Sequence, residues 1–382
     1  MQAFRNAVGG QQRKKETVLF YWPDGEFNET HVYKDVGEIP RKLHEMGYDV
    51  AVLVGKLNVD NRQLWDRTYE LGEVPQRGPR PIKLLRKIVR MNATLLRLLL
   101  KERPSVIIVM YSDPRVLPVL AIYKYFIMKN RNVKIINKLD SDGSFASSAL
   151  WSLYYQLGTL FSDKVVIETT CAYERVVSSS LLKLMSRRLT VVPDGVSDDI
   201  LSYGPRRRER RKVILFVGAN EYRKGLDVLV RALFRIKDEL DGWKVVITSK
   251  YINDEYQNLI KKYIKLYGLE DKIEFINASR AELLDLYFSS SIFVLPTRQE
   301  SYGISVAEAL ASGLIVITTD GTCRRDFEHL GALIVKKDDV QELADALRYA
   351  IKNYEKLLAA RDFASNIKVR HDYHYLVSLL MK

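Results

Sequence analysis

The sequence predicts an α/β protein with two doubly wound domains that face a central cleft. Short apolar runs, rich in β-branched residues, recur along the 382 residues, as expected of parallel strands that are buried on both faces. Stretches with helical spacing separate these runs, which is typical of doubly wound sheets. A polar and strongly basic segment divides the runs into two series, which predicts two Rossmann-like domains rather than one.

The first series of apolar runs defines a first domain over residues 1–204. Its strands are expected at 17–21, 49–54, 105–110, 134–137, 164–167 and 189–192. Val192-Pro-Asp-Gly195 closes the series, and its proline and glycine indicate a turn. Residues 205–212 follow as a basic linker, with six basic residues and one acidic residue.

The second series predicts a second domain over residues 213–364. Residues 227–240 and 340–358 have the apolar spacing of helices. The strands are expected at 212–217, 244–248, 273–276, 291–295, 314–318 and 332–335. Ligands of doubly wound sheets bind beyond the carboxyl ends of the strands, so the loops at those ends are the candidate sites.

The net charge of +13 is confined to the first part of the chain. Residues 1–212 contain 36 Lys and Arg against 23 Asp and Glu, whereas residues 213–382 contain 24 of each. Residues 80–103, with eight basic residues and one acidic residue, and the linker hold most of the excess. The charge leaves nucleic-acid binding as one functional alternative, but we expect no nucleic-acid partner because no recognisable nucleic-acid module lies near either segment.

The composition, with 47% hydrophobic and 28% charged residues, indicates a globular protein. No apolar run approaches the roughly 20 residues of a membrane span. The first residues also lack the apolar core of a secretory signal. Cys171 and Cys323 lie 152 residues apart without a CxxC pattern, which predicts a reducing, cytoplasmic setting with neither a disulfide framework nor a metal site.

The loop at residues 218–225 follows a predicted strand and precedes a predicted helix. Gly218 and Gly225 allow a tight turn and a close approach of the backbone, and free N–H groups at the start of a helix favour an anion. Arg223 and Lys224 add positive charge for a diphosphate. An ordinary surface loop with solvated charges is the alternative.

A second candidate loop follows the predicted strand 291–295. Glu300 lies in this loop, and Glu308 comes eight residues later, about two turns into an apolar helix. A buried carboxylate at Glu308 requires hydrogen-bond donors, and sugar hydroxyls supply them. The alternative is that Glu308 forms a cap or an ion pair within the protein.

The frame from Glu300 to Gly313, E-x-Y-G-x-x-x-x-E-A-L-A-x-G, resembles the E-x7-E signature of the retaining glycosyltransferase family 4 (group 1). Three further segments agree in order with motifs of that family. Residues 192–196 resemble its P-N-G-V segment, residues 216–225 its V-G-R…K-G loop, and residues 314–318 the strand after A-x-G. The resemblance is good over residues 190–340 and weak before them.

The resemblance implies the GT-B fold, in which the first domain binds the acceptor and the second binds a nucleotide sugar. It also implies that residues 365–382 form a helix that crosses back to the first domain. The implied reaction is hexosyl transfer with retention, in which the leaving phosphate acts as base toward the acceptor hydroxyl. We therefore expect neither a metal ion nor a cofactor other than the nucleotide-sugar co-substrate.

The resemblance implies a role for each matched residue. Lys224, helped by Arg223, would stabilise the leaving diphosphate, and Glu300 would contact the donor sugar. Glu308 would bind the ribose hydroxyls of the donor. The remaining nucleotide-sugar-binding positions are Gly218 and Asn220 in the first loop, and Ser301, Tyr302, Gly303 and Ile304 through their backbone N–H groups.

Three positions depart from the pattern of the family. Ala219 stands where the family has arginine, Leu139 stands where it often has histidine, and the usual glycine-rich loop after the first strand, at residues 22–27, contains one glycine. Asp140 is retained beside Leu139 and is expected in the catalytic cleft. A loop or cap role for Asp140, or metal binding together with Asp142 as a D-x-D pair, are the alternatives, and a catalytically degenerate protein is another.

Basic residues form a stripe on a predicted helix within residues 80–103, beside a mostly apolar side. They are Lys83, Arg86, Lys87, Arg90, Arg97 and Lys101. A basic amphipathic helix predicts binding to an anionic membrane surface, and a surface helix that covers the sheet is the alternative. We therefore expect a cytoplasmic glycosyltransferase, peripheral at the inner membrane face, that acts on a lipid-linked glycan, a glycolipid or a polysaccharide. A soluble glycosyltransferase with a small or polymeric acceptor is the second reading.

Overall fold

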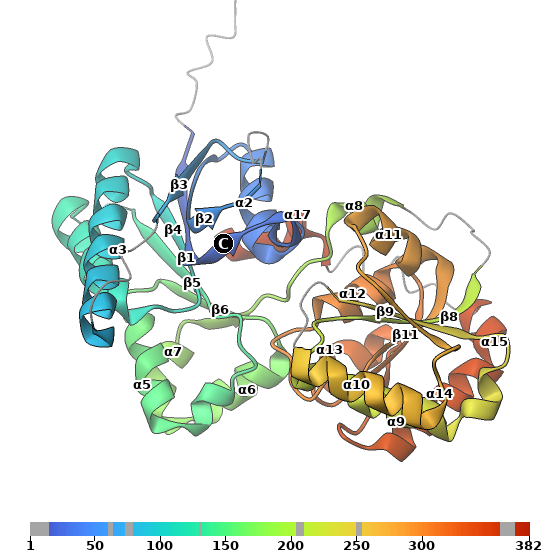
Figure 1. Ribbon diagram of the computed structural model, residues 1–382. Helices are drawn as coiled ribbons and strands as arrows, with labels where there is room; N and C mark the ends of the chain where they lie inside the picture. Colours follow the sequence, from blue (N-terminus) through green and yellow to red (C-terminus); the bar gives the residue numbers. More distant parts are fainter. Residues whose placement is uncertain are drawn as a thin grey trace, which may run out of the picture.

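The computed structural model describes residues 15–59, 64–72, 79–129, 132–203, 210–249, 254–359 and 371–382. Over these residues it shows two α/β domains side by side, each with a central sheet that helices cover (Figure 1). All strand pairs within both sheets are parallel, as the continuous apolar runs predicted. The predicted fold class is thus confirmed.

The sheet of the first domain has the strand order β3-β2-β1-β4-β5-β6-β7 in the described residues. Its strands are β1 (Thr17–Phe27), β2 (Asp49–Leu57), β3 (Arg67–Glu70), β4 (Val106–Met110), β5 (Lys134–Lys138), β6 (Lys164–Ile167) and β7 (Leu189–Val191). The edge strand β3 was not predicted, because its sequence Arg-Thr-Tyr-Glu contains no apolar run. Residues 22–27, interpreted from the sequence as a loop, continue β1 with an irregular register between Trp22 and Glu26.

The sheet of the second domain has the order β10-β9-β8-β11-β12-β13 in the described residues. Its strands are β8 (Arg211–Val217), β9 (Lys244–Thr248), β10 (Ile273–Ile276), β11 (Ser290–Leu295), β12 (Ile315–Thr319) and β13 (Leu333–Val335). Because β8 begins at Arg211, the last residues of the predicted linker belong to a strand. Residues 205–209 of that linker lie outside the described residues.

The helices pack on both faces of the two sheets. They are α1 (Glu29–Val32), α2 (Asp35–Glu45), α3 (Arg80–Glu102), α4 (Leu117–Ala121), α5 (Ala149–Gly158), α6 (Thr170–Ser178), α7 (Lys183–Ser186), α8 (Asp198–Tyr203), α9 (Leu226–Arg235), α10 (Asp254–Tyr267), α11 (Arg280–Ser289), α12 (Ile304–Ala311), α13 (Arg324–Phe327), α14 (Val340–Lys352), α15 (Tyr354–Ala359) and α17 (Tyr373–Met381). The helix predicted at 340–358 is divided at Asn353, where α14 ends and α15 begins.

The first domain has an apolar core on each face of its sheet, and β1 supplies both. Val18 and Phe20 belong to one core, whereas Leu19 and Tyr21 belong to the other, because successive side chains of a strand point to opposite faces. The chain returns from the second domain to complete the first of these cores. Its last helix, α17, packs against α2 and buries Leu376, among others, in that core.

Two passages of the chain between the domains lie together. Val196, on the way to the second domain, forms a parallel bridge with Asp372, on the way back. The α17 helix is then fixed at its carboxyl end, where the ammonium groups of Lys134 and Lys164 donate hydrogen bonds of 2.6 Å to the carbonyl oxygens of Met381 and Leu379. Cations at this end of a helix satisfy carbonyl groups that have no partner within the helix.

A disulfide joins the two domains, so the prediction that the cysteines form none was wrong. Cys171 lies at the start of α6 in the first domain, and Cys323 directly precedes α13 in the second. The two cysteines lie 152 residues apart in the sequence but close together in the structure, because the loops after β6 and β12 meet across the domain boundary. The hydroxyl of Thr170 also donates a 2.8 Å hydrogen bond to Asp326 there. The cysteines therefore no longer argue for a reducing setting.

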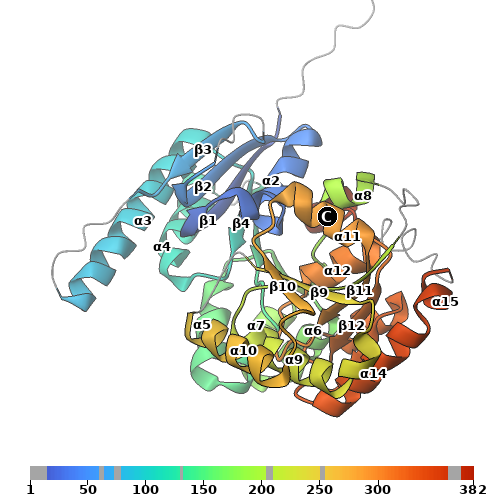
Figure 2. The ribbon, with the colours of Figure 1, turned by 45° about the vertical axis from the view of Figure 1, so that its right-hand side comes forward.

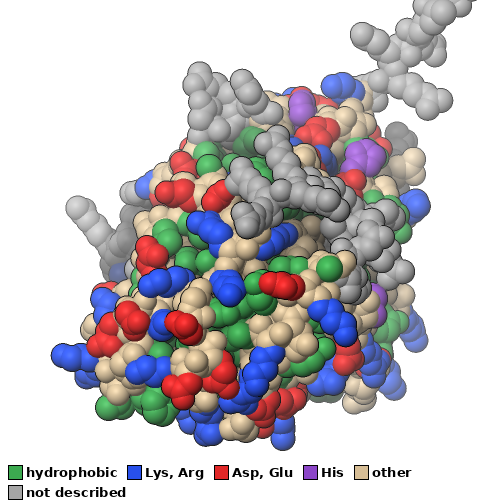
Figure 3. Space-filling model, turned by 90° about the vertical axis from the view of Figure 1, so that its right-hand side faces the viewer, with side chains coloured by type: hydrophobic (Ala, Val, Ile, Leu, Met, Phe, Trp, Pro, Cys, Tyr) green, Lys and Arg blue, Asp and Glu red, His purple; other side chains and the backbone are tan. Residues whose placement is uncertain are grey.

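The neutral second part and the basic helix of the first part lie on different domains. Figure 3 shows the outer face of the second domain, on which basic and acidic side chains are interspersed. In the first domain, Figure 2 shows α3 reaching beyond the body of the domain at its amino-terminal end. The basic stripe predicted from the sequence therefore lies on a projecting helix.

Candidate functional site

The candidate residues of the second domain lie at the carboxyl ends of β8 and β11. After β8, the short helix η5 (Tyr222–Lys224) leads to Gly225, which has a φ of +71°. A Cβ at this glycine would lie 1.9 Å from the carbonyl oxygen of Pro296, so only glycine fits the close approach of the two loops. The contact holds the loop that carries Arg223 and Lys224 against the loop that carries Glu300.

Arg298 holds the loop at residues 218–225 in place. No motif in the sequence indicated this residue. Its guanidinium forms two hydrogen bonds of 2.8 and 2.9 Å with Asp227 and stacks 3.7 Å over the ring of Tyr222. Burial raises the pKa of Asp227, but hydrogen bonds from Arg298 and Tyr256 outweigh burial and hold this pKa below its ordinary value. The loop is thus held by a bidentate ion pair.

Glu300 brings the predicted catalytic residues of this domain together. Its Oε1 accepts hydrogen bonds from Lys224 Nζ at 2.5 Å and from Thr297 Oγ1 at 3.0 Å, and its Oε2 accepts one from Arg223 at 3.2 Å. Glu300 is 8% exposed. Arg223 also pairs with Glu221 at 2.7 Å, so the two cations face two carboxylates. An anionic ligand that binds Lys224 and Arg223 therefore competes with these carboxylates.

The segment between Glu300 and α12 presents its backbone rather than its side chains. Gly303 precedes α12 with a φ of +109°, and no side chain caps this helix. The side chain of Tyr302 is buried, and its hydroxyl lies 2.8 Å from Nδ1 of His371. Ile304 begins α12. The N–H groups predicted to bind the donor thus stand at a helix start, where uncapped N–H groups donate hydrogen bonds to an anion or a hydroxyl oxygen.

Glu308 is 5% exposed, and the protein itself contacts both of its oxygens. Oε1 accepts hydrogen bonds of 3.1 Å from both terminal nitrogens of Arg280, and Oε2 accepts one of 3.0 Å from the hydroxyl of Tyr287. The ion pair that the sequence left open as an alternative is therefore present. A carboxylate offers about four acceptor positions, so these contacts leave capacity for further donors.

Two further predicted positions lie in the first loop. A Cβ at Gly218 would meet only ordinary contacts, the nearest at 3.4 Å from Leu295, so no protein atom requires a glycine there. The side chain of Asn220 is buried, and its Oδ1 has no hydrogen-bond partner among the described residues. Its backbone N–H donates a 2.9 Å hydrogen bond to Ser249. Asn220 is therefore buried inside the loop and supports its conformation through its backbone N–H group.

The first domain meets this site with a buried cluster of charges at the carboxyl ends of its strands. The ammonium of Lys138 lies 2.8 Å from Glu168, 2.7 Å from Asp194 and 2.9 Å from Asp35, and all four side chains are buried. Burial lowers the pKa of Lys138, but the carboxylates outweigh burial and raise it well above its ordinary value. Burial in turn raises the pKa of Glu168 and Asp194. The sequence did not single out this cluster.

Asp140 comes two residues after Lys138 in the chain, and its side chain points toward the second domain. It adopts a φ of +46°, and Glu168 holds this conformation by accepting the backbone N–H groups of Asp140 and Ser141 at 3.0 and 3.1 Å. The Asp140 side chain hydrogen-bonds to Ser301, beside Glu300. Burial, followed by the charge of Asp35, raises the pKa of Asp140. Asp140 therefore lies against the Glu300 loop.

Two neighbours of Asp140 in the sequence behave differently. Leu139 is buried in the core of the first domain. Asp142 accepts a 2.9 Å hydrogen bond from the side chain of Gln299, across the domain boundary. Over the described ranges, no group of three or more histidine, cysteine or acidic side chains is arranged to hold a metal ion.

A cavity of about 680 Å³ opens between the domains next to these contacts. Its walls include Asp142, Gly143 and Arg175 from the first domain and Arg298 and Gln299 from the second. Hydroxyl, carboxylate and guanidinium groups line it, and Gln299 connects it to the adjacent Glu300. This cavity is a polar space between the two domains, of the size of a small-molecule pocket, and it lies beside Glu300 and Lys224, which do not line it.

The second domain matches a known protein family. Residues 201–368 match the family described as glycosyl transferases group 1. The chain is 28% identical over 218 residues to a GDP-mannose:cellobiosyl-diphosphopolyprenol alpha-mannosyltransferase from Xanthomonas campestris, and the aligned part covers 54% of this chain and 57% of that enzyme. The chain therefore spans little more than half the length of this relative.

The whole chain superposes on solved structures of low sequence identity. A glycosyltransferase from Rickettsia africae ESF-5 gives a TM-score of 0.75 at 16% identity, over 96% of this chain and 97% of that one. HepE from Anabaena, solved with UDP and glucose, gives a TM-score of 0.71 at 15% identity, over 95% of this chain and 98% of that one. At these identities the superposition shows the fold alone.

Proposed function

We propose that the protein is a glycosyltransferase that moves a sugar from a nucleotide-sugar donor to an acceptor hydroxyl. The chain has the GT-B fold, and its second domain matches the group 1 glycosyl transferases. The observation that carries the proposal is the convergence of Lys224 and Arg223 on Glu300, with Asp140 of the first domain against the same loop. The site brings two cations of the second domain together with carboxylates from both domains, which suits a diphosphate joined to a sugar.

The diphosphate of the donor takes the place of Glu300 as the partner of Lys224 and Arg223. Charge develops on this diphosphate as the bond to the sugar breaks, and fixed cations stabilise that charge better than reorienting water does. Glu300 is then released to accept hydrogen bonds from sugar hydroxyls. The reaction proceeds with retention and without a metal ion, and the leaving phosphate takes the proton of the acceptor hydroxyl.

The other predicted residues bind or orient the donor. Glu308 accepts hydrogen bonds from the ribose hydroxyls, and the backbone N–H groups at the start of α12 contact the sugar or the phosphate. Asp140, held by Glu168, closes the sugar site from the first domain. The acceptor belongs to the lipid-linked glycans, glycolipids or polysaccharides, in line with the diphosphopolyprenol named for the relative from Xanthomonas campestris.

A binding screen tests the donor half of the proposal. We expect at least one of UDP, GDP and ADP to raise the melting temperature of the protein, since a ligand that binds only the folded state stabilises it by mass action. The matching nucleotide sugars should then be hydrolysed or transferred slowly. The control is the corresponding nucleoside, which lacks the diphosphate. Equal shifts with nucleoside and diphosphate, or no shift with any, would contradict the proposal.

We also propose that the first domain docks on an anionic membrane surface at the cytoplasmic face. In the part of the chain that the structure describes, no helix has the length and apolar character to cross a bilayer. On α3, however, Leu84, Leu85 and Val89 are each more than half exposed among the basic residues. Exposed apolar side chains beside Lys and Arg suit the boundary between head groups and acyl chains.

Vesicle co-sedimentation tests this surface. We expect the protein to sediment with vesicles that contain phosphatidylglycerol and to remain in solution with pure phosphatidylcholine. Serine at Leu84, Leu85 and Val89 should weaken the binding strongly, because apolar insertion is lost while the charge is kept. The control is Leu266→Ser on α10 of the second domain, where the leucine is 74% exposed, more than any of these three side chains. Unchanged binding of the triple variant, or equal binding to neutral vesicles, would refute the proposal.

A further inference from the structure

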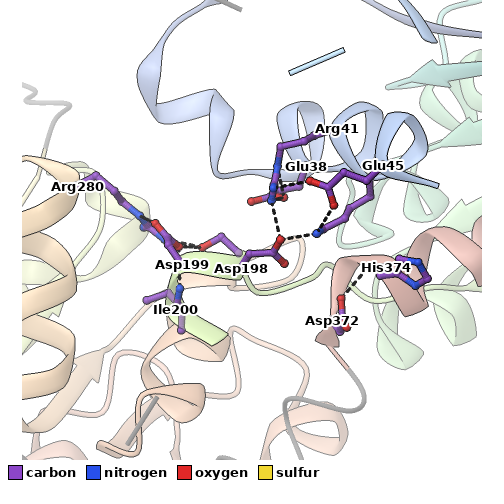
Figure 4. Close-up of polar contacts among 11 residues, drawn as sticks. Glu38, Arg41, Glu45, Asp198, Asp199, Ile200, Arg280, Asp372 and His374 are labelled. Atoms are coloured by element: carbon purple, nitrogen blue, oxygen red, sulfur yellow. Dashed lines mark hydrogen bonds and ion pairs between the residues drawn. The ribbon is translucent and has the colours of Figure 1, made fainter. Parts of the chain in front are cut away.

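Two neighbouring aspartates at the start of α8 point to opposite domains (Figure 4). Asp198 turns to α2 of the first domain, where its Oδ2 pairs with Lys42 and lies 3.2 Å from Arg41. Glu38 and Glu45, on the same helix, bind these two cations and hold them in place. The Asp198 carboxylate therefore fixes the beginning of α8 to the first domain.

Asp199 turns to the second domain and binds Arg280 on α11. Two nitrogens of the guanidinium each lie 2.8 Å from an oxygen of Asp199. The hydroxyl of Ser197 accepts a third hydrogen bond from Arg280 and itself donates to Asp199, both at 2.5 Å. This bidentate geometry fixes the plane of the guanidinium, which a single contact would not do.

The same guanidinium contacts Glu308, the carboxylate of the proposed ribose site. Its two terminal nitrogens lie 3.1 Å from Oε1 of Glu308, and its central carbon lies 4.6 Å from the ring of Tyr33 in the first domain. Burial lowers the pKa of Arg280, but Asp199 and Glu308 outweigh burial and raise it above its ordinary value. Arg280 therefore remains charged and joins the segment 197–199 to Glu308.

Building on the proposed donor site, we infer that Arg280 is the positioning residue for Glu308 and that Asp198 sets the position of Arg280 from the first domain. The contacts run in series: α2 holds Asp198, the adjacent Asp199 holds Arg280, and Arg280 holds Glu308. A change in the placement of the first domain therefore reaches the ribose site through this series. Donor affinity depends on residues that touch no donor atom.

Nucleotide affinity of three variants tests the inference. We would measure by calorimetry the binding of whichever of UDP, GDP and ADP binds the unmodified protein. Arg280→Lys keeps a positive charge near Glu308 but loses the planar fork, and should weaken binding at least about fivefold, the lower end of couplings between sites. Asp198→Asn, whose side chain lies away from Glu308, should weaken binding as well. Asp345→Asn, an exposed partner of Arg348 on α14, is the control with the same change of charge.

A cycle with Glu308→Gln separates positioning from general loss of structure. If Arg280 acts through Glu308, Arg280→Lys has little further effect once Glu308→Gln is present, whereas independent effects add. All measurements are made well below the melting temperature of each variant. Additive effects, or affinities of Arg280→Lys or Asp198→Asn within twofold of the unmodified protein, would overturn the inference. If no nucleoside diphosphate binds the unmodified protein, the proposed function fails and the inference fails with it.

Discussion

Replacing Lys138 by methionine is expected to lower the free energy of unfolding by about 3 to 5 kcal/mol, the usual loss when a buried charge is left without its partner. Three carboxylates, on Asp35, Glu168 and Asp194, lie within 2.9 Å of its ammonium, and none is more than 7% exposed in its side chain. Methionine fills a similar volume, so the loss reports the charges rather than a cavity.

Urea denaturation of Lys138→Met at several pH values checks this expectation. Burial already raises the pKa of Glu168 and of Asp194, and removal of the ammonium raises both further. The folded variant therefore binds more protons than its unfolded chain, so its stability is greatest at low pH and falls as the pH rises through these raised pKa values. Relative to the unmodified protein, the variant should therefore lose less stability at low pH than at high pH.

The matched control is Lys124→Met, another buried lysine of the first domain. Among the residues that the structure describes, Asp163 is the one carboxylate paired with Lys124, and the side chain of Asp163 is 41% exposed. Water solvates this aspartate after the substitution, so a smaller loss is expected. Equal losses in the two variants would show that burial of the lysine, and not its three carboxylates, determines the effect at Lys138.

Replacing Lys224 by alanine is expected to reduce donor turnover by about 10²- to 10³-fold, the usual effect of removing one group that stabilises charge in a transition state. The fold should survive, because Glu300 keeps hydrogen bonds from Thr297 and Arg223. Negative charge develops on the diphosphate as it leaves, so loss of the cation destabilises the transition state more than the bound donor. Turnover should therefore fall more than nucleotide affinity does.

Steady-state turnover with the donor found in the binding screen measures this effect. Lys262→Ala, on the exposed face of α10, removes the same charge outside the site and should leave turnover unchanged. A Lys224→Ala enzyme with turnover within threefold of the unmodified protein would contradict the assignment of Lys224. It would leave Arg223 as the cation that stabilises the leaving group.

Much of the fold was predictable because its strands are buried on both faces. Runs such as Val-Ile-Ile-Val-Met in β4 are apolar throughout and mark their own ends. The edge strand β3 escaped prediction because an edge strand with a polar sequence has no such signal. In the second domain, Lys224 and Glu300 were predictable as site residues because each belongs to a motif that lies within one loop. The structure pairs the two side chains.

The remaining parts of the site depend on contacts between distant segments. Lys138 ends β5, whereas its carboxylates lie at the start of α2 and after β6 and β7, and Arg280 reaches Glu308 from another helix. A single sequence carries no signal for such pairs, since each residue alone resembles a solvated charge. Cys171 and Cys323 were misjudged for the same reason.

The disulfide also limits how the two domains move. The two passages of the chain beside Val196 and Asp372 form one attachment, near α8 and α17, and the disulfide forms a second, between α6 and α13. Figure 1 shows these attachments at opposite ends of the boundary between the domains. Two separated attachments leave one rotation, about the line that joins them. With the disulfide intact, a rotation of one domain against the other is confined to that axis, whereas reduction to two thiols removes the second attachment and this restriction.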